Sequence, residues 1–549
     1  MFKEEIYQEA MNSQGFTICP LLDKQEVDAL KDLYLKSFDD DNISGMFATH
    51  NRNNATLSKF LSQEIVAITK KKLDKFFSNY HSFVAHFVVK SENAENEFSL
   101  HQDWNIVDEK DYKSYHIWIP LSFTSPHNGG MFVLPKSHLL FKNERSGSFG
   151  TPAVASKDLP NGMLKDLNIP TSHALVWNDA TFHGSHSNLS DEKRISVVLV
   201  IHEKNAPTAY SNYDEEKGCL EKYPLSADDL LENLEILEKG AIPKAWKAFA
   251  SSPYTQFKNS AINASVLEEK WKRLKDKTIT NLPVLRDHDF QLQMETNGYA
   301  ILPFLSEEEV EKAKIILDKE SEYAKHLNAP RYTSLELENE HSKNSIHKEL
   351  RHLFAPGLDR LFKNYKTPIF QFFIKMPKSD GEVGMHTDSS LLLNPALEPH
   401  YGLWIPLIDV DENNGGLKVV RGSHNWYAGF LTSSFNWPFF PYLDDLKKNA
   451  KQLKLKAGQL VVFDNRMIHG SCFNNSNEPR IAVAGRITHE FSSYYSFLQE
   501  REGFVSVFEE KEDIYLNDAF KGDRLSAAGG NKIGEAKQPT LNNEIFNFE

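Results

Sequence analysis

The chain has 549 residues, of which 40% are hydrophobic, 12% aromatic and 25% charged, and its formal net charge is −14. This length allows two or three domains with separate cores, and the composition is that of an ordinary globular protein. The acidic balance argues against nucleic acid as the main partner, because proteins that bind it need a basic face to displace phosphate counterions.

The cysteine content and the length of the apolar runs exclude further classes of protein. The three cysteines, Cys19, Cys219 and Cys472, are too few and too scattered for a disulfide framework or a zinc knuckle. The opening residues, MFKEEIYQEAMNSQGF, lack the basic start and apolar run of a signal peptide, and no window approaches the roughly 20 apolar residues that cross a bilayer. We therefore expect a cytoplasmic protein that binds neither nucleic acid nor membrane; its oligomeric state stays open.

In chain order, the first predicted elements are a short strand after Gly15 and a helix that begins after Asp23. Asp23 and Glu26 have capping-box spacing, in which side chains bond the free amides of the first helical turn. Short runs of β-branched and aromatic residues then predict strands at residues 83–90, 116–122, 131–134, 175–177 and 195–202. Many short strands after an opening helix indicate a mainly β fold with flanking helices (α+β), of the antiparallel jelly-roll type with a cavity at its mouth.

Residues 206–285 carry amphipathic patterns typical of helices, in LSADDLLENLEILEKG and SVLEEKWKRLKDK, and predict a helical connector or lid. The first pattern of elements then begins again. GFTICPLLDKQEVDAL from Gly15 matches GYAILPFLSEEEVEKA from Gly298, and Ser306 and Glu309 repeat the capping-box spacing.

Matching positions keep a nearly constant separation along the two copies. The offset is 283 residues from Gly15 to Gly298 and 285 from His101 to His386. It is 286 for the pairs Trp118 and Trp404, His183 and His469, and Arg194 and Arg480. So small a drift indicates a tandem duplication. The predicted domains are residues 1–205 and 286–500, with the connector at 206–285 between them and a polar, flexible tail at 501–549.

A metal site is predicted in the first copy. A β-strand places residues two apart on one face, so His101 and Asp103 can offer an imidazole and a carboxylate to one metal ion. A third ligand must come from elsewhere, and His183, in TFHGSHSN, is the candidate because it follows a strand and a turn. Two histidines and one carboxylate leave three coordination positions open, which is the arrangement in non-haem iron(II) oxygenases.

An arginine recurs at a fixed distance from the distal histidine. Arg194 follows His183 by eleven residues, and Arg480 follows His469 by the same interval. An arginine fork in a cavity suits a terminal carboxylate, which it can hold with two charge-assisted hydrogen bonds. 2-Oxoglutarate presents such a carboxylate.

The order of these motifs resembles the phytanoyl-CoA dioxygenase family of iron(II)- and 2-oxoglutarate-dependent oxygenases. Each copy has HxD, then WIPL, a Gly-Gly turn, a Ser-His pair, and HGS followed by Asn and Arg, and the match covers about residues 10–205 and 290–490. The resemblance implies two tandem double-stranded β-helix, cupin-like domains, each with one iron(II) and each using 2-oxoglutarate and O2. It implies as metal ligands His101, Asp103 and His183 in the first copy, and His386, Asp388 and His469 in the second.

The same resemblance assigns residues to the cosubstrate. Arg194 and Arg480 would bind the C5 carboxylate of 2-oxoglutarate. Residues at family positions near the cosubstrate are Gln102, Ser185 and Ser471, although the second copy has Thr387 in place of Gln102. Trp118 and Trp404 are core or cavity-wall residues that could also contact the cosubstrate. Halogenating relatives replace the metal aspartate by a small residue, so the presence of both aspartates favours hydroxylation or another oxidation.

Several alternatives stay open. His186 competes with His183 as the third ligand, but its counterpart is Cys472, whereas His183 matches His469.

The activity and the substrate also stay open. One copy could have lost its catalytic turnover. The segments after the two HxD motifs differ, WNIVDEKDYKSYH against SSLLLNPALEPHY, so the sites could act on different substrates or on successive positions of one, with an amino-acid-like or natural-product intermediate preferred. The alternatives to an oxygenase are a cupin-like isomerase or hydrolase and a double-barrel binding protein with one or no active site; the recurring arginines disfavour both.

Overall fold

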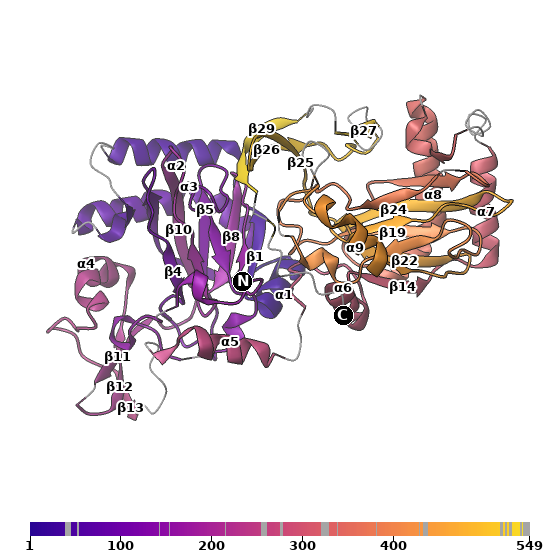
Figure 1. Cartoon of the computed structure of the whole chain (residues 1–549). Helices are drawn as coiled ribbons and strands as arrows, with labels where there is room; N and C mark the ends of the chain where they lie inside the picture. Colours follow the sequence, from indigo (N-terminus) through magenta and orange to yellow (C-terminus); the bar gives the residue numbers. More distant parts are fainter. Residues whose placement is uncertain are drawn as a thin grey trace. The chain divides into compact units, whose positions relative to one another are not determined.

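The computed structural model describes residues 1–38, 45–51, 54–141, 143–152, 154–214, 216–253, 261–274, 278–319, 329–337, 339–379, 381–427, 429–431, 437–516, 520–521, 524–525, 530–538 and 541. The chain divides into two compact units, Met1–Asn281 and Leu282–Glu549, each with its own sheets and helices (Figure 1). Among the helices of the described ranges, none combines the length and the apolar character that a membrane span requires.

The first unit contains three antiparallel sheets. Its six-stranded sheet has the order β1-β8-β5-β10-β3-β2, with β1 (Phe16–Pro20), β8 (His173–Asn178), β5 (Ser114–Pro120), β10 (Arg194–Glu203), β3 (Tyr80–Lys90) and β2 (Met46–Ala48). A four-stranded sheet has the order β4 (Phe98–His101), β9 (His183–Ser185), β6 (Met131–Val133) and β7 (Lys165–Asp166). A three-stranded sheet contains β11 (Ala209–Asp214), β12 (Cys219–Pro224) and β13 (Ala250–Pro253). The helices are α1 (Glu5–Gln14), α2 (Lys24–Ser37), α3 (Ala55–Phe76), α4 (Ala227–Glu238) and α5 (Ala264–Lys272).

The second unit repeats this plan. Its larger sheet has the order β14-β22-β19-β24-β17-β15, with β14 (Tyr299–Pro303), β22 (Gln459–Asp464), β19 (His400–Pro406), β24 (Arg480–His489), β17 (Phe370–Lys375) and β15 (Arg331–Thr333), and β16 (Tyr365–Lys366) pairs with β24. The four-stranded sheet contains β18 (Val383–His386), β23 (His469–Ser471), β20 (Leu417–Val419) and β21 (Lys451–Gln452). Further sheets are formed by β25 (Tyr494–Arg501), β26 (Phe504–Glu510) and β29 (Asn531–Lys537), and by β27 (Phe520–Lys521) and β28 (Arg524–Leu525). The helices are α6 (His288–Asn297), α7 (Glu307–Asp318), α8 (Glu340–Leu361) and α9 (Leu443–Asn449).

Side-chain alternation gives the larger sheet two different faces. In β17, Phe372 and Ile374 join a core to which α7 and α8 also contribute, with Leu350 and Phe354 from α8. Successive residues of a strand point to opposite faces, so Lys375 points away from these helices. The helices thereby bury one face, and the other face carries polar side chains such as Lys375 together with residues of a second apolar core, among them Trp404, Val461 and Phe463.

The local predictions from the sequence are confirmed. Both capping boxes form, at the start of α2 with Asp23 and Glu26 and at the start of α7 with Ser306 and Glu309. The five strands expected in the first copy overlap β3, β5, β6, β8 and β10. The fold is mainly β, with antiparallel sheets and flanking helices.

The segments after each copy differ from the expectation. Residues 206–285 contain the sheet β11-β12-β13 as well as α4 and α5, and residues 501–549, expected as a flexible tail, contain β26 and β29. Their strands are held by contacts distant in sequence: Tyr210 packs in one core with Ile106, and Ile514 in another with Leu391. Such packing overrides local propensity, which is why the sequence pattern indicated helices and a tail.

The burial of Ile514 gives a test of this added structure. Ile514 is fully buried with Ile369, Leu391, Leu392 and Tyr494, so Ile514→Ala is expected to lower the free energy of unfolding of the second unit by about 2–5 kcal/mol. Urea unfolding followed by hydrogen exchange of β25 and β26 measures this. The control Ile315→Ala, at a side chain 54% exposed, should change stability by less than about 0.5 kcal/mol; equal effects of the two substitutions would show that residues after 501 do not pack as described.

Candidate metal centres

The first centre lies where β4 and β9 pair. His101 ends β4 and His183 begins β9; the antiparallel register sets them opposite each other, with ring centroids 4.3 Å apart. The Asp103 carboxylate has Oδ1 4.0 Å from His101 Nε2 and Oδ2 3.6 Å from His183 Nε2. One ligand atom from each of the three residues lies within 4.8 Å of the others. The three side chains can therefore share one metal ion.

The second centre has the same construction. His386 ends β18, His469 begins β23, and the register again sets them opposite, with ring centroids 4.3 Å apart. Asp388 Oδ1 lies 4.0 Å from His386 Nε2, and the three ligand atoms lie within 4.8 Å of one another. His186, the competing candidate in the first copy, instead pairs with Asp166 at 2.7 Å.

Backbone carbonyls fix the orientation of all four imidazoles. Each Nδ1 lies 2.8–3.0 Å from the carbonyl oxygen of the residue two positions earlier, namely Ser99, Thr181, Gly384 and Met467. A carbonyl only accepts hydrogen bonds, so Nδ1 must carry the proton. The Nε2 lone pair is thereby directed to the metal position, as in histidine ligands held by a hydrogen bond on the other ring nitrogen.

Burial sets the protonation states that a metal requires. Loss of solvent lowers the pKa of His183 to about 3 and that of His469 to about 4, and it also lowers the pKa of His101. Burial alone would raise the pKa of Asp103, but the neighbouring imidazoles and the Trp177 indole hold it at about 2. Neutral imidazole and ionised carboxylate are the forms that ligate a metal.

The two carboxylates have different partners. Trp177 Nε1 donates to Asp103 Oδ2 at 2.7 Å, and His116 Nδ1 lies 3.4 Å from the same oxygen and 2.8 Å from Asp179 Oδ1. His116, Asp103 and Asp179 also have metal-ligand spacing, but 2.8 Å is a hydrogen-bond distance, so we assign a His-Asp hydrogen bond. In the second centre, Arg486 Nη2 lies 2.7 Å from Asp388 Oδ2.

A buried arginine accompanies each centre. Arg194 is 2% exposed and Arg480 0%, and their guanidinium carbons lie 5.4 Å from the ring centroids of Trp118 and Trp404. Within the described residues, Nε of both arginines and Nη2 of Arg480 have no hydrogen-bond partner. Unused donors on a buried cation are unfavourable, and a carboxylate would satisfy them. These arginines therefore fit the distal carboxylate of 2-oxoglutarate.

A buried lysine supports each distal histidine, and the sequence analysis did not single it out. Lys90 Nζ donates to the carbonyls of Ser185 and His186, and Lys375 Nζ to those of Ser471 and Cys472, with 3.0 and 3.1 Å to the two serines. Burial lowers the pKa of both lysines to about 7. The lysine ends both FVAHFVVK and PIFQFFIK at the common offset of 285, a signal that could have identified it.

The remaining predicted residues lie close to the centres with varied contacts. Gln102 is buried, and its side-chain amide donates to the carbonyl of Ala180 at 2.6 Å. Thr387 Oγ1, at the matching position, accepts from Trp437 Nε1 at 3.0 Å. Ser185 and Ser471 are buried in β9 and β23. Their contact with a cosubstrate stays a prediction.

The copy-specific residues were not accessible to sequence reasoning. Trp177, His116 and Asp179 correspond to Phe463, Gly402 and Asn465, and Arg486 corresponds to Val200, as the strand registers show. None of these residues recurs in the other copy, so the repeat gave no indication of them.

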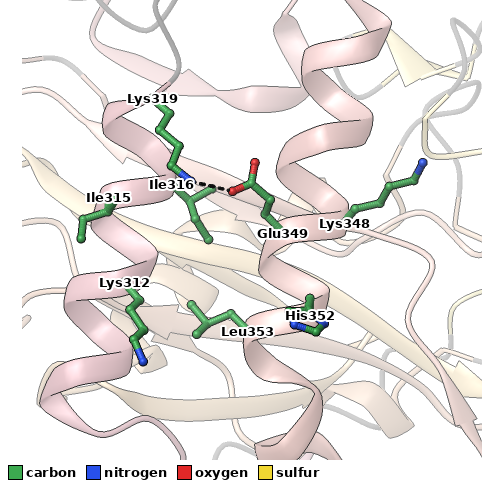
Figure 2. Close-up of a pocket in the computed structure, with 8 residues that line it drawn as sticks. All are labelled: Lys312, Ile315, Ile316, Lys319, Lys348, Glu349, His352 and Leu353. Atoms are coloured by element: carbon green, nitrogen blue, oxygen red, sulfur yellow. Dashed lines mark hydrogen bonds and ion pairs between the residues drawn. The ribbon is translucent and has the colours of Figure 1, made fainter.

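A surface groove in the second unit is separate from its metal centre. It has a volume of about 450 Å³ and lies between α7 and α8, where Ile315 and Leu353 are flanked by Lys312 and Lys348 and Lys319 pairs with Glu349 at 3.1 Å (Figure 2). No predicted ligand or arginine lines it. The groove has no part in the chemistry of the centre.

Each of the two units therefore carries a His, Asp, His cluster that could hold a metal ion and a buried arginine whose unused donors could bind a carboxylate. The family model described as phytanoyl-CoA dioxygenase (PhyH) matches residues 14–196 and 294–482. The chain belongs to this family, and the two matched regions are its tandem copies.

Individual relatives match only part of the chain. Phytanoyl-CoA dioxygenase 1 of Oryza sativa subsp. japonica is 31% identical over 144 residues, covering 24% of this chain and 49% of that protein. Phytanoyl-CoA dioxygenase domain-containing protein 1 of Danio rerio is 25% identical over 232 residues, covering 38% of this chain and 75% of that protein. The chain thus spans about half the length of the rice relative. The crystal structure of EvdO2 from Micromonospora carbonacea var. aurantiaca aligns at 19% identity and a TM-score of 0.27, covering 36% of this chain and 91% of that one.

The roles of Lys90 and Lys375 can be tested with each lysine serving as the control for the other. Lys90→Met, made together with His386→Ala so that only the first centre remains, is expected to weaken Ni(II) binding about 10- to 100-fold, because the carbonyls after His183 lose their donor. Lys375→Met together with His386→Ala should leave the Ni(II) affinity of the first centre unchanged. Lys375→Met together with His101→Ala should weaken Ni(II) binding at the second centre. Calorimetric Ni(II) titration measures both; unchanged affinity in the matched pairs would show that the lysines do not support the ligands.

Proposed function

We propose that the protein is an iron(II)- and 2-oxoglutarate-dependent dioxygenase with two active sites. The observation that carries this is the pairing, in each unit, of a two-histidine, one-carboxylate cluster with a buried arginine that has unused donors. Membership of the phytanoyl-CoA dioxygenase family supports the same reaction class. One iron(II) per unit is the stoichiometry we expect.

We further propose that each unit is a double-stranded β-helix. A large and a small antiparallel sheet in each unit support this fold, because a jelly roll is a double sheet. The metal ligands lie on the small sheet and in the loop after β4 or β18, whereas the arginine begins the long strand β10 or β24. A ligand placed between Arg194 and the first metal position would therefore lie between the two sheets.

The chain's own residues orient, bind and shield the reactants. When bound, iron(II) and 2-oxoglutarate would supply the activation of O2 for oxidation of a C–H bond. His101, Asp103 and His183 would hold the metal ion, and two histidines with one carboxylate would leave positions open for cosubstrate and O2. Arg194 would bind the far carboxylate of the cosubstrate, and Trp104, next in sequence to Asp103, packs against an apolar cluster. In the second unit, His386, Asp388, His469 and Arg480 would have the roles of the corresponding ligands and arginine.

The substrate proposed is a small metabolite, amino-acid-like or a natural-product intermediate, and the reaction is hydroxylation. The segments after HxD support different substrates, or successive positions of one substrate, for the two sites. In the first unit this segment packs Trp104 against Tyr210, with ring centroids 5.7 Å apart; in the second it buries Leu391 and Leu392. A cytoplasmic location and the absence of nucleic-acid or membrane partners remain part of this proposal.

Succinate formation tests the reaction class without knowledge of the substrate. Anaerobically iron-loaded protein exposed to air is expected to convert 2-oxoglutarate to succinate slowly. His101→Ala and His386→Ala should each retain part of the activity, and the double variant none, because each removes a ligand of one centre only. Loss of all activity in one single variant would contradict two working sites. No succinate and no 2-oxoglutarate binding would favour a metal-dependent isomerase or a binding protein.

The two arginines are tested by cosubstrate affinity. Arg194→Met in the His386→Ala background is expected to weaken 2-oxoglutarate binding to the Ni(II)-loaded protein about 10- to 100-fold, since hydrogen bonds to charged groups contribute about 1.5–3 kcal/mol. Arg194→Lys should recover part of this loss, because it keeps the charge without the fork. Arg421→Met, at an exposed arginine, is the control, and the Kd is measured by calorimetry. An unchanged Kd in Arg194→Met would exclude the arginine as the carboxylate site.

A further inference from the structure

The residues that surround the two candidate metal aspartates, Asp103 and Asp388, differ between the two units. Around Asp103 these are Trp177, His116 and Asp179, and at the matching positions the second unit has Phe463, Gly402 and Asn465. Conversely, Arg486 contacts Asp388, and Val200 stands at its position in the first unit. Four positions that touch or adjoin one carboxylate therefore differ together, while the three metal ligands and the carboxylate-binding arginine are the same.

The exchange is also consistent sterically. Gly402 lies beside the Phe463 ring, and a Cβ at residue 402 would approach three atoms of that ring more closely than real Cβ atoms do. A histidine like His116 would therefore require the Phe463 ring to move in the second unit. The space that the imidazole leaves is on the face where Arg486 projects, since residues 402 and 486 are cross-strand partners.

The first centre carries excess negative charge. Asp103 and Asp179 are two carboxylates, with the single imidazole of His116 between them. Arg145 is also near, where its Nε donates to the Asp103 carbonyl at 2.7 Å, but its charge is matched by Glu109, which its Nη2 contacts. Whether His116 is neutral or protonated, the carboxylates outnumber the cations, which favours a divalent cation.

The second centre has no such excess. Arg486 Nη2 lies 2.7 Å from Asp388 Oδ2, and both side chains are largely buried, at 16% and 17% exposed. A guanidinium is protonated at any pH in the working range. A divalent ion bound by Asp388 would lie near this fixed positive charge in a medium that screens it poorly. The guanidinium also draws electron density from the carboxylate that must donate to the metal.

We infer that Arg486 makes the second centre the weaker metal site, so that the two centres of one chain fill at different concentrations of free iron(II). This inference rests on the proposed function and deepens it, because each site is active only when its metal is bound. At iron(II) concentrations high enough to fill the first centre but too low to fill the second, only the first site would be active. Arg486 is a positioning residue in this scheme, because it acts through the ligand Asp388, which it contacts.

Equilibrium binding of metal to single centres tests the inference. The full chain is titrated anaerobically with Fe(II), and aerobically with Ni(II), in His386→Ala, which leaves the first centre, and in His101→Ala, which leaves the second. The Kd of the second centre is expected to be about 10- to 100-fold higher, the range found when partners of a metal ligand are changed. Arg486→Val, which installs the residue of the first copy, should remove most of this difference. Arg486→Lys should keep it, because the charge remains, and Arg501→Val, at an exposed ion pair with Glu535, should have no effect.

The outcomes separate this inference from the proposed function. Two centres that bind metal with equal Kd, or a difference that Arg486→Val leaves intact, would overturn the role of Arg486 while leaving the dioxygenase proposal standing. Should Arg486→Val fail to fold, Arg486→Gln, which removes the charge but keeps a long polar side chain, replaces it; an unchanged difference in Arg486→Gln would overturn the role of Arg486. No metal binding at either centre would overturn the dioxygenase proposal and this inference together.

Discussion

The pairing of two short strands is the constraint on which each centre depends. His101 and His183, and likewise His386 and His469, are cross-strand partners, and a register break precedes the first histidine of each pair. A slip of one residue would turn the imidazoles to the other face of the sheet. The carbonyls that accept from Nδ1 are those of the same two strands or the turn before them, so the register also fixes the tautomer. Lys90 and Lys375 tie the distal strand to the large sheet at the point where this register matters.

The shared half of each site could be predicted from the sequence because the duplication repeats it. His101, Asp103, His183 and Arg194 each have a counterpart at a nearly constant offset, and local patterns also predicted the capping boxes and five strands. Arg486 could not be found in this way. It lies 98 residues beyond Asp388 on a different sheet, and only the strand registers bring the two together. The strands after each copy were missed for a related reason, since their apolar residues pack against distant loops rather than in a local pattern.

Duplication explains how one carboxylate can acquire new partners while the ligand set stays constant. The ligands are held by backbone carbonyls and strand pairing, neither of which depends on the side chains that surround the aspartate. Replacing Trp177 and His116 by Phe463 and Gly402 therefore leaves the histidines in place, and the 4.3 Å separation of their rings is the same in both units. The arrangement of the histidines is therefore the same in both units, whereas the charged residues around the aspartates differ.

The three-stranded sheets that follow the two copies also differ in the contacts they make. Each copy is followed by a three-stranded sheet, β11-β12-β13 or β25-β26-β29. The first places Tyr210 against Trp104, whereas the segment after β26 places the Tyr515 hydroxyl 3.2 Å from His400 Nε2. These tyrosines are not among the candidate metal ligands, so their contacts can differ between the units while the ligand geometry stays the same. Under the proposed function, one ligand geometry with different surroundings and different charge in the two units would allow two reactions of one chemical class within one chain.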